Sequence, residues 1–296
     1  MTASPVKYFE NDYKYSGQEN EELYGQCFHS YGFLEAMFDK YITPLEIYGL
    51  TANADQLEEL KALIDYKKRV IPGESDWDIN HSNFTYIAML YTTLTAIQHG
   101  LITHPIIYTN TVARGVRFME DLIKLSNKFG GILNHSNVKV LSGDDKVSDR
   151  IEYINNHFSK HAVSVLVNSR CLQEGISVSK ADSVIIIDPR HSAADLIQIL
   201  GRPVRLDDEN PDKVAKIFIP MVIEKNDEGR MIFNETCFGA TRDWLTAITS
   251  SDSDFATYFG ETEGVFKVNF NDDSRKGISY REVKDPNAPV VPSPNN

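Results

Sequence analysis

The sequence predicts an α/β fold in which a parallel sheet is covered by helices on both faces. Between about residues 104 and 222, short apolar segments alternate with stretches of helical periodicity, a pattern typical of βαβ units and a parallel sheet. The apolar segments are hydrophobic throughout, as expected when helices cover both faces of the sheet. The predicted strands are Pro105–Tyr108, Val138–Leu141, Val163–Val167, Val184–Ile187 and Val214–Val222.

Helices are expected between these strands because apolar residues recur there every three to four positions. This spacing covers residues 112–126, 148–158 and 192–200. Nearer the amino terminus we expect a strand at Leu45–Leu50 and helices at 55–68 and 83–98, and near the carboxyl terminus a helix at 242–249. The Pro- and Asn-rich segment after residue 284 is typical of disorder.

Composition excludes several classes of protein. The 296 residues are 42% apolar and 24% charged, an ordinary globular balance. The net charge of -12 excludes a polycation that coats nucleic acid by bulk attraction, although a local grip on a backbone stays possible. The 3 cysteines form no CxxC pair, so neither a disulfide framework nor a zinc site is indicated. With no apolar signal core and no long apolar run, we expect a cytoplasmic protein.

Residues 191–205, with the sequence HSAADLIQILGRPVR, carry the strongest indication of chemistry. On a helical wheel Gln198, Arg202 and Arg205 share one face, opposite an apolar face. Two neighbouring arginine forks suit the oxygens of a phosphate group. Ordinary ion pairing at a helix end is the alternative, and it is favoured if this segment is considered alone. Pro203 lacks an N–H, which predicts that the helix ends or kinks there.

A second candidate is the loop after the strand Val163–Val167. In an open parallel sheet, ligands bind beyond the carboxyl ends of the strands. Ser169 and the backbone at Gly175 are therefore placed where they could contact phosphates. A plain βα loop with a turn glycine is the alternative interpretation.

Together these segments resemble the C-terminal RecA-like lobe of superfamily 2 helicases, most closely the DEAD/DEAH-like and restriction-type DNA helicases. Gln198-x3-Arg202-x2-Arg205 is similar to motif VI of that family, and residues 169–177 are similar to motif V. Residues 106–110 resemble motif IV, and Leu141-Ser142-Gly143 with Arg150 resembles the segment that follows motif IV. Residues 2–5 (TASP) resemble motif III, and residues 30–47 resemble the entry to the second lobe.

The resemblance implies a RecA-like (P-loop NTPase-like) parallel sheet with flanking helices and a smaller C-terminal extension. It implies that Arg202 and Arg205 are arginine fingers directed at ATP, that Gln198 positions them, and that Gly175 and Ser177 lie near the nucleotide. Contacts to a nucleic-acid backbone are implied for Thr109, Asn110, Gly143 and Ser169, and coupling of hydrolysis to strand movement for Thr2 and Ser4.

The sequence also departs from the family. Ser177 stands where motif V usually has Asp, so the carboxylate that this motif usually supplies is missing at that position. No Gly-Lys dipeptide occurs, so a GxxxxGK[ST] loop is absent. The Asp-Glu pairs at 208–209 and 227–228 lie in charged loops instead of following an apolar strand. We therefore expect ATP and Mg²⁺ to be held mainly by a first lobe outside these residues, and this chain alone to be inactive.

These observations favour the C-terminal half of an ATP-dependent helicase or translocase, with nucleic acid and a first RecA-like lobe as partners. DNA is favoured over RNA by the resemblance alone. The alternative is a non-catalytic nucleic-acid-binding or adaptor remnant; an unrelated nucleotide-binding enzyme is disfavoured because no GxGxxG follows a strand. The expected divisions are 1–43 (first-lobe remnant and linker), 44–224 (second lobe), 225–280 (extension) and 281–296 (disordered tail).

Overall fold

The computed structural model describes residues 32–53, 76–169, 178–188, 198–225, 231–233, 265–269 and 279–281. Within these ranges the strands form a nine-stranded sheet in the order β3-β4-β2-β5-β6-β1-β8-β9, with β7 paired to β6. The expected helices at 55–68 and 242–249, and the expected disordered tail, lie outside the described residues.

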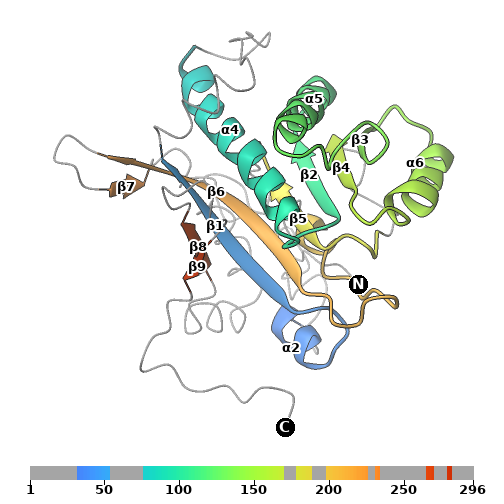
Figure 1. The fold of residues 1–296 in the computed structure, drawn as a ribbon. Helices are drawn as coiled ribbons and strands as arrows, with labels where there is room; N and C mark the ends of the chain where they lie inside the picture. Colours follow the sequence, from blue (N-terminus) through green and yellow to red (C-terminus); the bar gives the residue numbers. More distant parts are fainter. Residues whose placement is uncertain are drawn as a thin grey trace, which may run out of the picture.

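The centre of the sheet is parallel. The strands are β1 (Leu45–Asn53), β2 (Pro105–Thr109), β3 (Val138–Ser142), β4 (Val165–Ser169), β5 (Ser183–Ile186) and β6 (Ala215–Lys225). Figure 1 shows the long strands β1 and β6 side by side, paired in parallel from Leu45 with Ala215 to Asn53 with Ile223. Beyond β1 lies β8 (Val265–Asn269), also parallel, while β7 (Met231–Phe233) and β9 (Ser279–Arg281) pair antiparallel to β6 and β8.

Helices cover both faces of the sheet. On one face α4 (Asp76–Gln98) and α5 (Val112–Lys128) pack over the strands, and both views show them on the same side. On the other face lie α6 (Val147–Tyr153), the π-helical turn η1 (Ile154–Phe158), residues 199–204 and part of the segment around α2 (Phe33–Phe38).

The alternation of side chains along the strands produces two cores. Ile107 belongs to the core under α4 and α5, whereas its neighbours Ile106 and Tyr108 belong to the core on the opposite face. Both sides of β2, β4 and β5 are therefore buried, which explains their continuous apolar sequence. The edge strand β3 is only partly buried.

The predicted parallel α/β fold is confirmed, and all six strands expected from the sequence are present. The helix expected at 148–158 is divided, because α6 ends at Tyr153 and a π-helical turn follows. The single helical face proposed for Gln198, Arg202 and Arg205 is wrong: residues 198–200 are helical, but residues 201–204 form turns. Pro203 accounts for this, as expected for a residue that cannot donate the next helical hydrogen bond.

Strands β8 and β9 continue the sheet past β1, while the proposed divisions at residues 43, 224 and 280 stay predictions. Among the helices that the structure describes, none is long and apolar enough to cross a membrane.

Candidate functional site

Three candidate residues meet at the carboxyl edge of the parallel sheet. Thr109 at the end of β2 lies in register with Ser169 at the end of β4. Ser169 is in turn in register with Ser142 at the end of β3, immediately before Gly143. Parallel strands thus bring these segments together from distant positions in the sequence, as expected for a ligand-binding edge.

Their exposure differs. Thr109 is 0% exposed and Ser169 is 3% exposed, and the Thr109 hydroxyl donates to the carbonyl oxygen of Thr111 at 3.2 Å. Asn110 is half-buried and Gly143 is exposed. At this edge Asn110 and Gly143 are therefore accessible to solvent, whereas Thr109 and Ser169 are buried.

Close packing of α5 fixes the end of β2. A Cβ atom placed on Gly115 would lie 3.1 Å from the Thr109 Oγ1 atom, 3.2 Å from Val167 and 3.3 Å from Val140. Only glycine allows this approach without displacing a neighbour. The helix begins at Thr111, whose side-chain oxygen accepts a hydrogen bond from the backbone N–H of Arg114 at 3.2 Å, a normal N-cap contact.

The arginine segment lies next to the same edge. Gln198 is exposed, Arg205 is half-buried and Arg202 is only 4% exposed. Burial lowers the pKa of Arg202; the charge of Arg205 lowers it further, while Tyr108 acts in the opposite direction. Because burial disfavours the charged form of the Arg202 guanidinium, an anion bound beside it would be stabilising.

Sequence reasoning missed Asp188, which directly follows Ile187 at the end of the β5 segment. One carboxylate oxygen accepts a hydrogen bond from the backbone N–H of Asn110 at 2.6 Å. The other forms an ion pair with the guanidinium of Arg114. The available signal was its position, since an Asp after an apolar strand lies at the edge where ligands bind.

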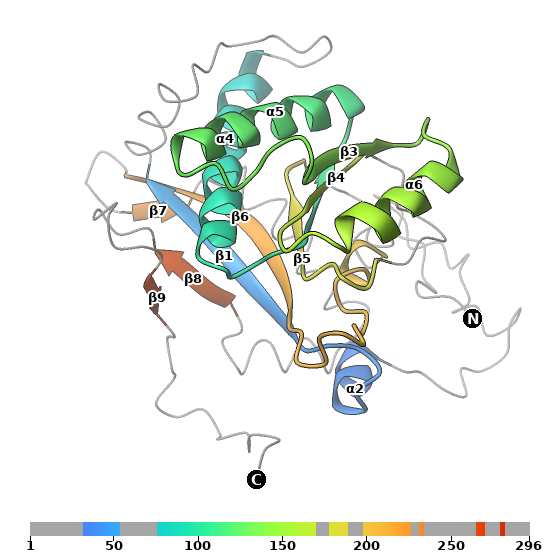
Figure 2. The same cartoon turned by 45° about the vertical axis from the view of Figure 1, so that its right-hand side comes forward.

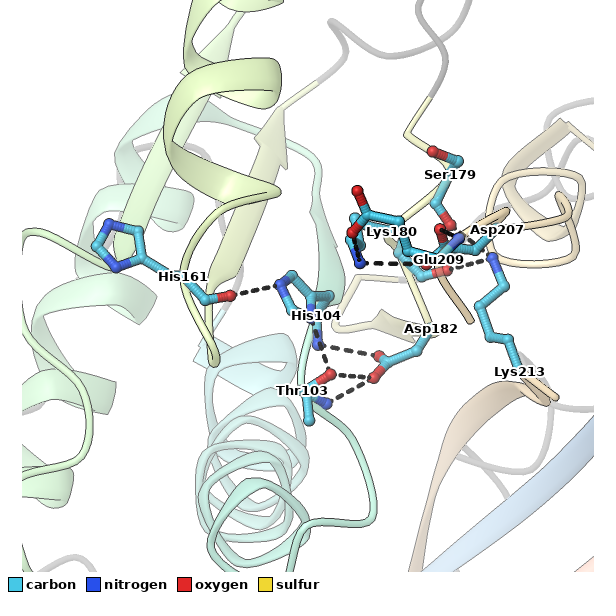
Figure 3. Close-up of polar contacts among 10 residues, drawn as sticks. Thr103, His104, His161, Ser179, Lys180, Asp182, Asp207, Glu209 and Lys213 are labelled. Atoms are coloured by element: carbon cyan, nitrogen blue, oxygen red, sulfur yellow. Dashed lines mark hydrogen bonds and ion pairs between the residues drawn. The ribbon is translucent and has the colours of Figure 1, made fainter. Parts of the chain in front are cut away.

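A second polar cluster, at the amino ends of β2 and β5, was also missed (Figure 3). Asp182 accepts hydrogen bonds from the backbone N–H groups of Thr103 and His104, at 2.6 and 3.1 Å. It also accepts one from the Thr103 hydroxyl at 2.8 Å. The imidazole of His104 lies 3.0 Å from the carbonyl oxygen of His161, and burial lowers the pKa of His104. These contacts join the starts of two strands.

Beside it, two lysines join the segment 178–182 to the loop 207–213. The Lys213 ammonium donates to the carbonyl oxygens of Ser179 at 2.6 Å and Ala181 at 3.2 Å. Its residue is 3% exposed, and burial lowers its pKa to about 8. Lys180 pairs with Glu209 at 2.6 Å, and the hydrogen bond to Glu209 is the main reason that the pKa of Lys180 is raised.

Four of the candidate residues, Thr2, Ser4, Gly175 and Ser177, lie outside the described residues. Within the part of the chain that is described, no group of three or more His, Cys, Asp or Glu side chains could hold a metal ion.

Comparison with known proteins assigns this architecture. Residues 88–207 match the family described as the helicase conserved C-terminal domain. Over 59 residues, 20% of this chain, the sequence is 37% identical to the probable helicase A859L of African swine fever virus. The fold matches the ATP-dependent type ISP restriction-modification enzyme LlaBIII bound to DNA with a TM-score of 0.61 and 17% identity, over 83% of this chain. Residues 88–207 are therefore similar to a helicase C-terminal domain, and the fold is that of a RecA-like lobe.

With a lower TM-score, 0.38 at 18% identity, 71% of this chain aligns with 86% of the C-terminal domain of the DEAD-box protein Dbp5. The matches cover 7% of the viral helicase and 16% of the restriction enzyme. The activities of those whole proteins consequently enter only as proposals.

Proposed function

We propose that this chain supplies the second lobe of an ATP-dependent nucleic-acid helicase or translocase. In this proposal a first RecA-like lobe holds ATP and Mg²⁺, and Arg202 and Arg205 reach the phosphates from the second lobe. The observation that carries the proposal is the match of residues 88–207, which include Arg202 and Arg205, to the helicase conserved C-terminal domain. An arginine finger stabilises charge in the phosphoryl-transfer transition state and contributes about 10³–10⁵ in rate in related enzymes.

Each remaining candidate has a role in this proposal. Gln198, exposed at the end of the helical segment, would orient the arginines or the nucleotide. Gly175 and Ser177 would face the same cleft. ATP would supply the transferable phosphoryl group and Mg²⁺ would neutralise its charge when both are bound to the first lobe. This chain's own contribution is to bring positive charge to the phosphates and to exclude water from them.

The nucleic-acid strand is proposed to lie across the carboxyl edge, over Asn110 and Gly143. Thr109 and Ser169 beneath them would contact phosphates after a local rearrangement, and Thr2 and Ser4 would couple that movement to hydrolysis. DNA is the proposed substrate, because the restriction enzyme with the matching fold is bound to DNA. Contacts to phosphates alone do not distinguish DNA from RNA, so labelled oligothymidylate and oligouridylate should be compared at one salt concentration.

The test of the arginine roles uses this chain joined to its first lobe. Arg202→Ala should lower ATP turnover by about 10³-fold or more while ATP binding is kept. Arg202→Lys should fail to restore the rate, because an ammonium lacks the planar fork. Arg117→Ala is the matched control, since Arg117 lies on α5 and pairs with Asp121 at 3.6 Å. Strand binding that ignores both nucleotide and the first lobe would instead favour the non-catalytic alternative.

A further inference from the structure

The turn that follows β2 is held by a side chain from a different strand. Asn110 lies in this turn, and its backbone N–H donates to the Asp188 Oδ2 atom at 2.6 Å. A hydrogen bond to a carboxylate is stronger than one between neutral groups. Asp188 is 3% exposed, so water does not readily replace this contact. The position of the turn therefore depends on where Asp188 lies.

The same carboxylate also fixes the first turn of α5. Its Oδ1 atom pairs with Arg114, and both side chains are largely buried. The Arg114 guanidinium also lies over the ring of Tyr86, 5.9 Å from the centroid. Removal of a buried carboxylate that accepts from a backbone N–H and pairs with a guanidinium loses both contacts at once.

Asp188 is also the start of the segment that leads to the arginines. It follows β5, which pairs with β2, and the backbone N–H of Ile187 donates to the carbonyl oxygen of Tyr108 at 3.2 Å. Tyr108 in turn interacts with the charge of Arg202. The end of β2 is thus held to the end of the β5 segment, at Ile187 and Asp188.

We propose that Asp188 is a positioning residue that sets the turn at Asn110 and so determines the affinity for a nucleic-acid strand. Its carboxylate links that turn to the first turn of α5 through Arg114, so that a shift of one is transmitted to the other. This inference rests on the proposed function, because it takes the turn at Asn110 as part of the strand-binding surface.

The test measures binding of labelled oligothymidylate by the full chain at fixed salt, with fluorescence anisotropy. Asp188→Asn removes a negative charge, which by electrostatics alone would strengthen binding to a polyanion. If Asp188 positions the turn, the affinity for oligothymidylate should instead fall, by about fivefold or more. Asp121→Asn is the matched control: Asp121 is also a buried acid that pairs with an α5 arginine and accepts from Tyr86 at 2.9 Å. The partners of Asp121 are Tyr86, Arg117 and Lys124, and not Asn110 or Arg114. The affinity of Asp121→Asn for oligothymidylate should therefore not fall.

Asp188→Glu is a second variant that keeps the charge and moves the carboxylate by one methylene. It should also weaken binding, and because the net charge is constant, bulk attraction cannot explain the change. Hydrogen exchange should show faster exchange of the amides at 110–114 in both variants with the sheet still protected. Binding by both variants as tight as that of the unsubstituted chain would overturn the inference and leave the proposed function intact. Failure of the unsubstituted chain to bind any strand would overturn both.

Discussion

Lys213 gives the sharpest prediction about stability. Its ammonium is buried, and two carbonyl oxygens, of Ser179 and Ala181, accept its hydrogen bonds. Burial lowers the pKa from 10.5 to about 8 despite the neighbouring carboxylates of Asp207 and Asp182. Between these two values the folded protein binds fewer protons at this site than the unfolded protein, so the free energy of unfolding rises with pH.

The size of the effect follows from the shift. At about 1.36 kcal/mol for each pKa unit, the whole change is about 3 kcal/mol, complete above the unfolded pKa. Titration curves with these two pKa values give about 2 kcal/mol between pH 7.5 and 9.5. Other groups titrate in the same range, so the predicted quantity is the difference between the unsubstituted chain and Lys213→Met.

The assay is urea unfolding of both proteins across this pH range. The stability of the unsubstituted chain relative to Lys213→Met should increase by about 2 kcal/mol as the pH rises. Lys124→Met, a change of an exposed lysine on α5, tests whether loss of any lysine charge gives the same trend. A difference between the unsubstituted chain and Lys213→Met that is constant with pH, or that decreases, would refute the reasoning.

Two further predictions concern the ends of β2. Gly115→Ala should destabilise the fold by about 1 kcal/mol in urea unfolding, because overpacking against Thr109 and Val167 exceeds the gain in helix propensity. Gly143→Ala is the control, because a Cβ atom at Gly143 has no neighbouring atom within 4 Å. Equal free energies of unfolding for the two variants would contradict the prediction and show that α5 can shift away from β2. At the other end, His104 has a lowered pKa because it is buried. The unfolded chain then binds more protons below about pH 6.5, so acid should destabilise the unsubstituted chain more than His104→Gln. Identical slopes with pH would contradict that assignment.

The parallel sheet was predictable because its physical cause is local in the sequence. Ile106 and Ile107 face opposite cores. A strand that is buried on both faces is a continuous apolar run in the sequence, and such a run is easily recognised. The end of the helical segment 198–200 was also partly predictable, since Pro203 cannot continue a helix. The helical wheel failed beyond that point because it assumes a regular helix.

The polar contacts were not predictable in the same way. Asp188 and Asn110 are 78 positions apart, and so are Asp182 and His104. Only the pairing of β2 with β5 brings each pair together. A sequence shows an Asp beside a strand, but it does not show which neighbouring strand ends next to it. The burial of Thr109 has the same origin, since Gly115 of α5 packs closely against it.

Complementation by a first lobe tests the central claim most directly. The isolated chain is mixed with the RecA-like lobe that carries the GxxxxGK[ST] loop and the Asp-Glu pair, and ATP hydrolysis is followed with and without single-stranded DNA. The account predicts negligible hydrolysis by either part alone and DNA-stimulated hydrolysis by the mixture, lost again with Arg202→Ala. Robust hydrolysis by the isolated chain, or an active mixture in which Arg202→Ala has no effect, would contradict it.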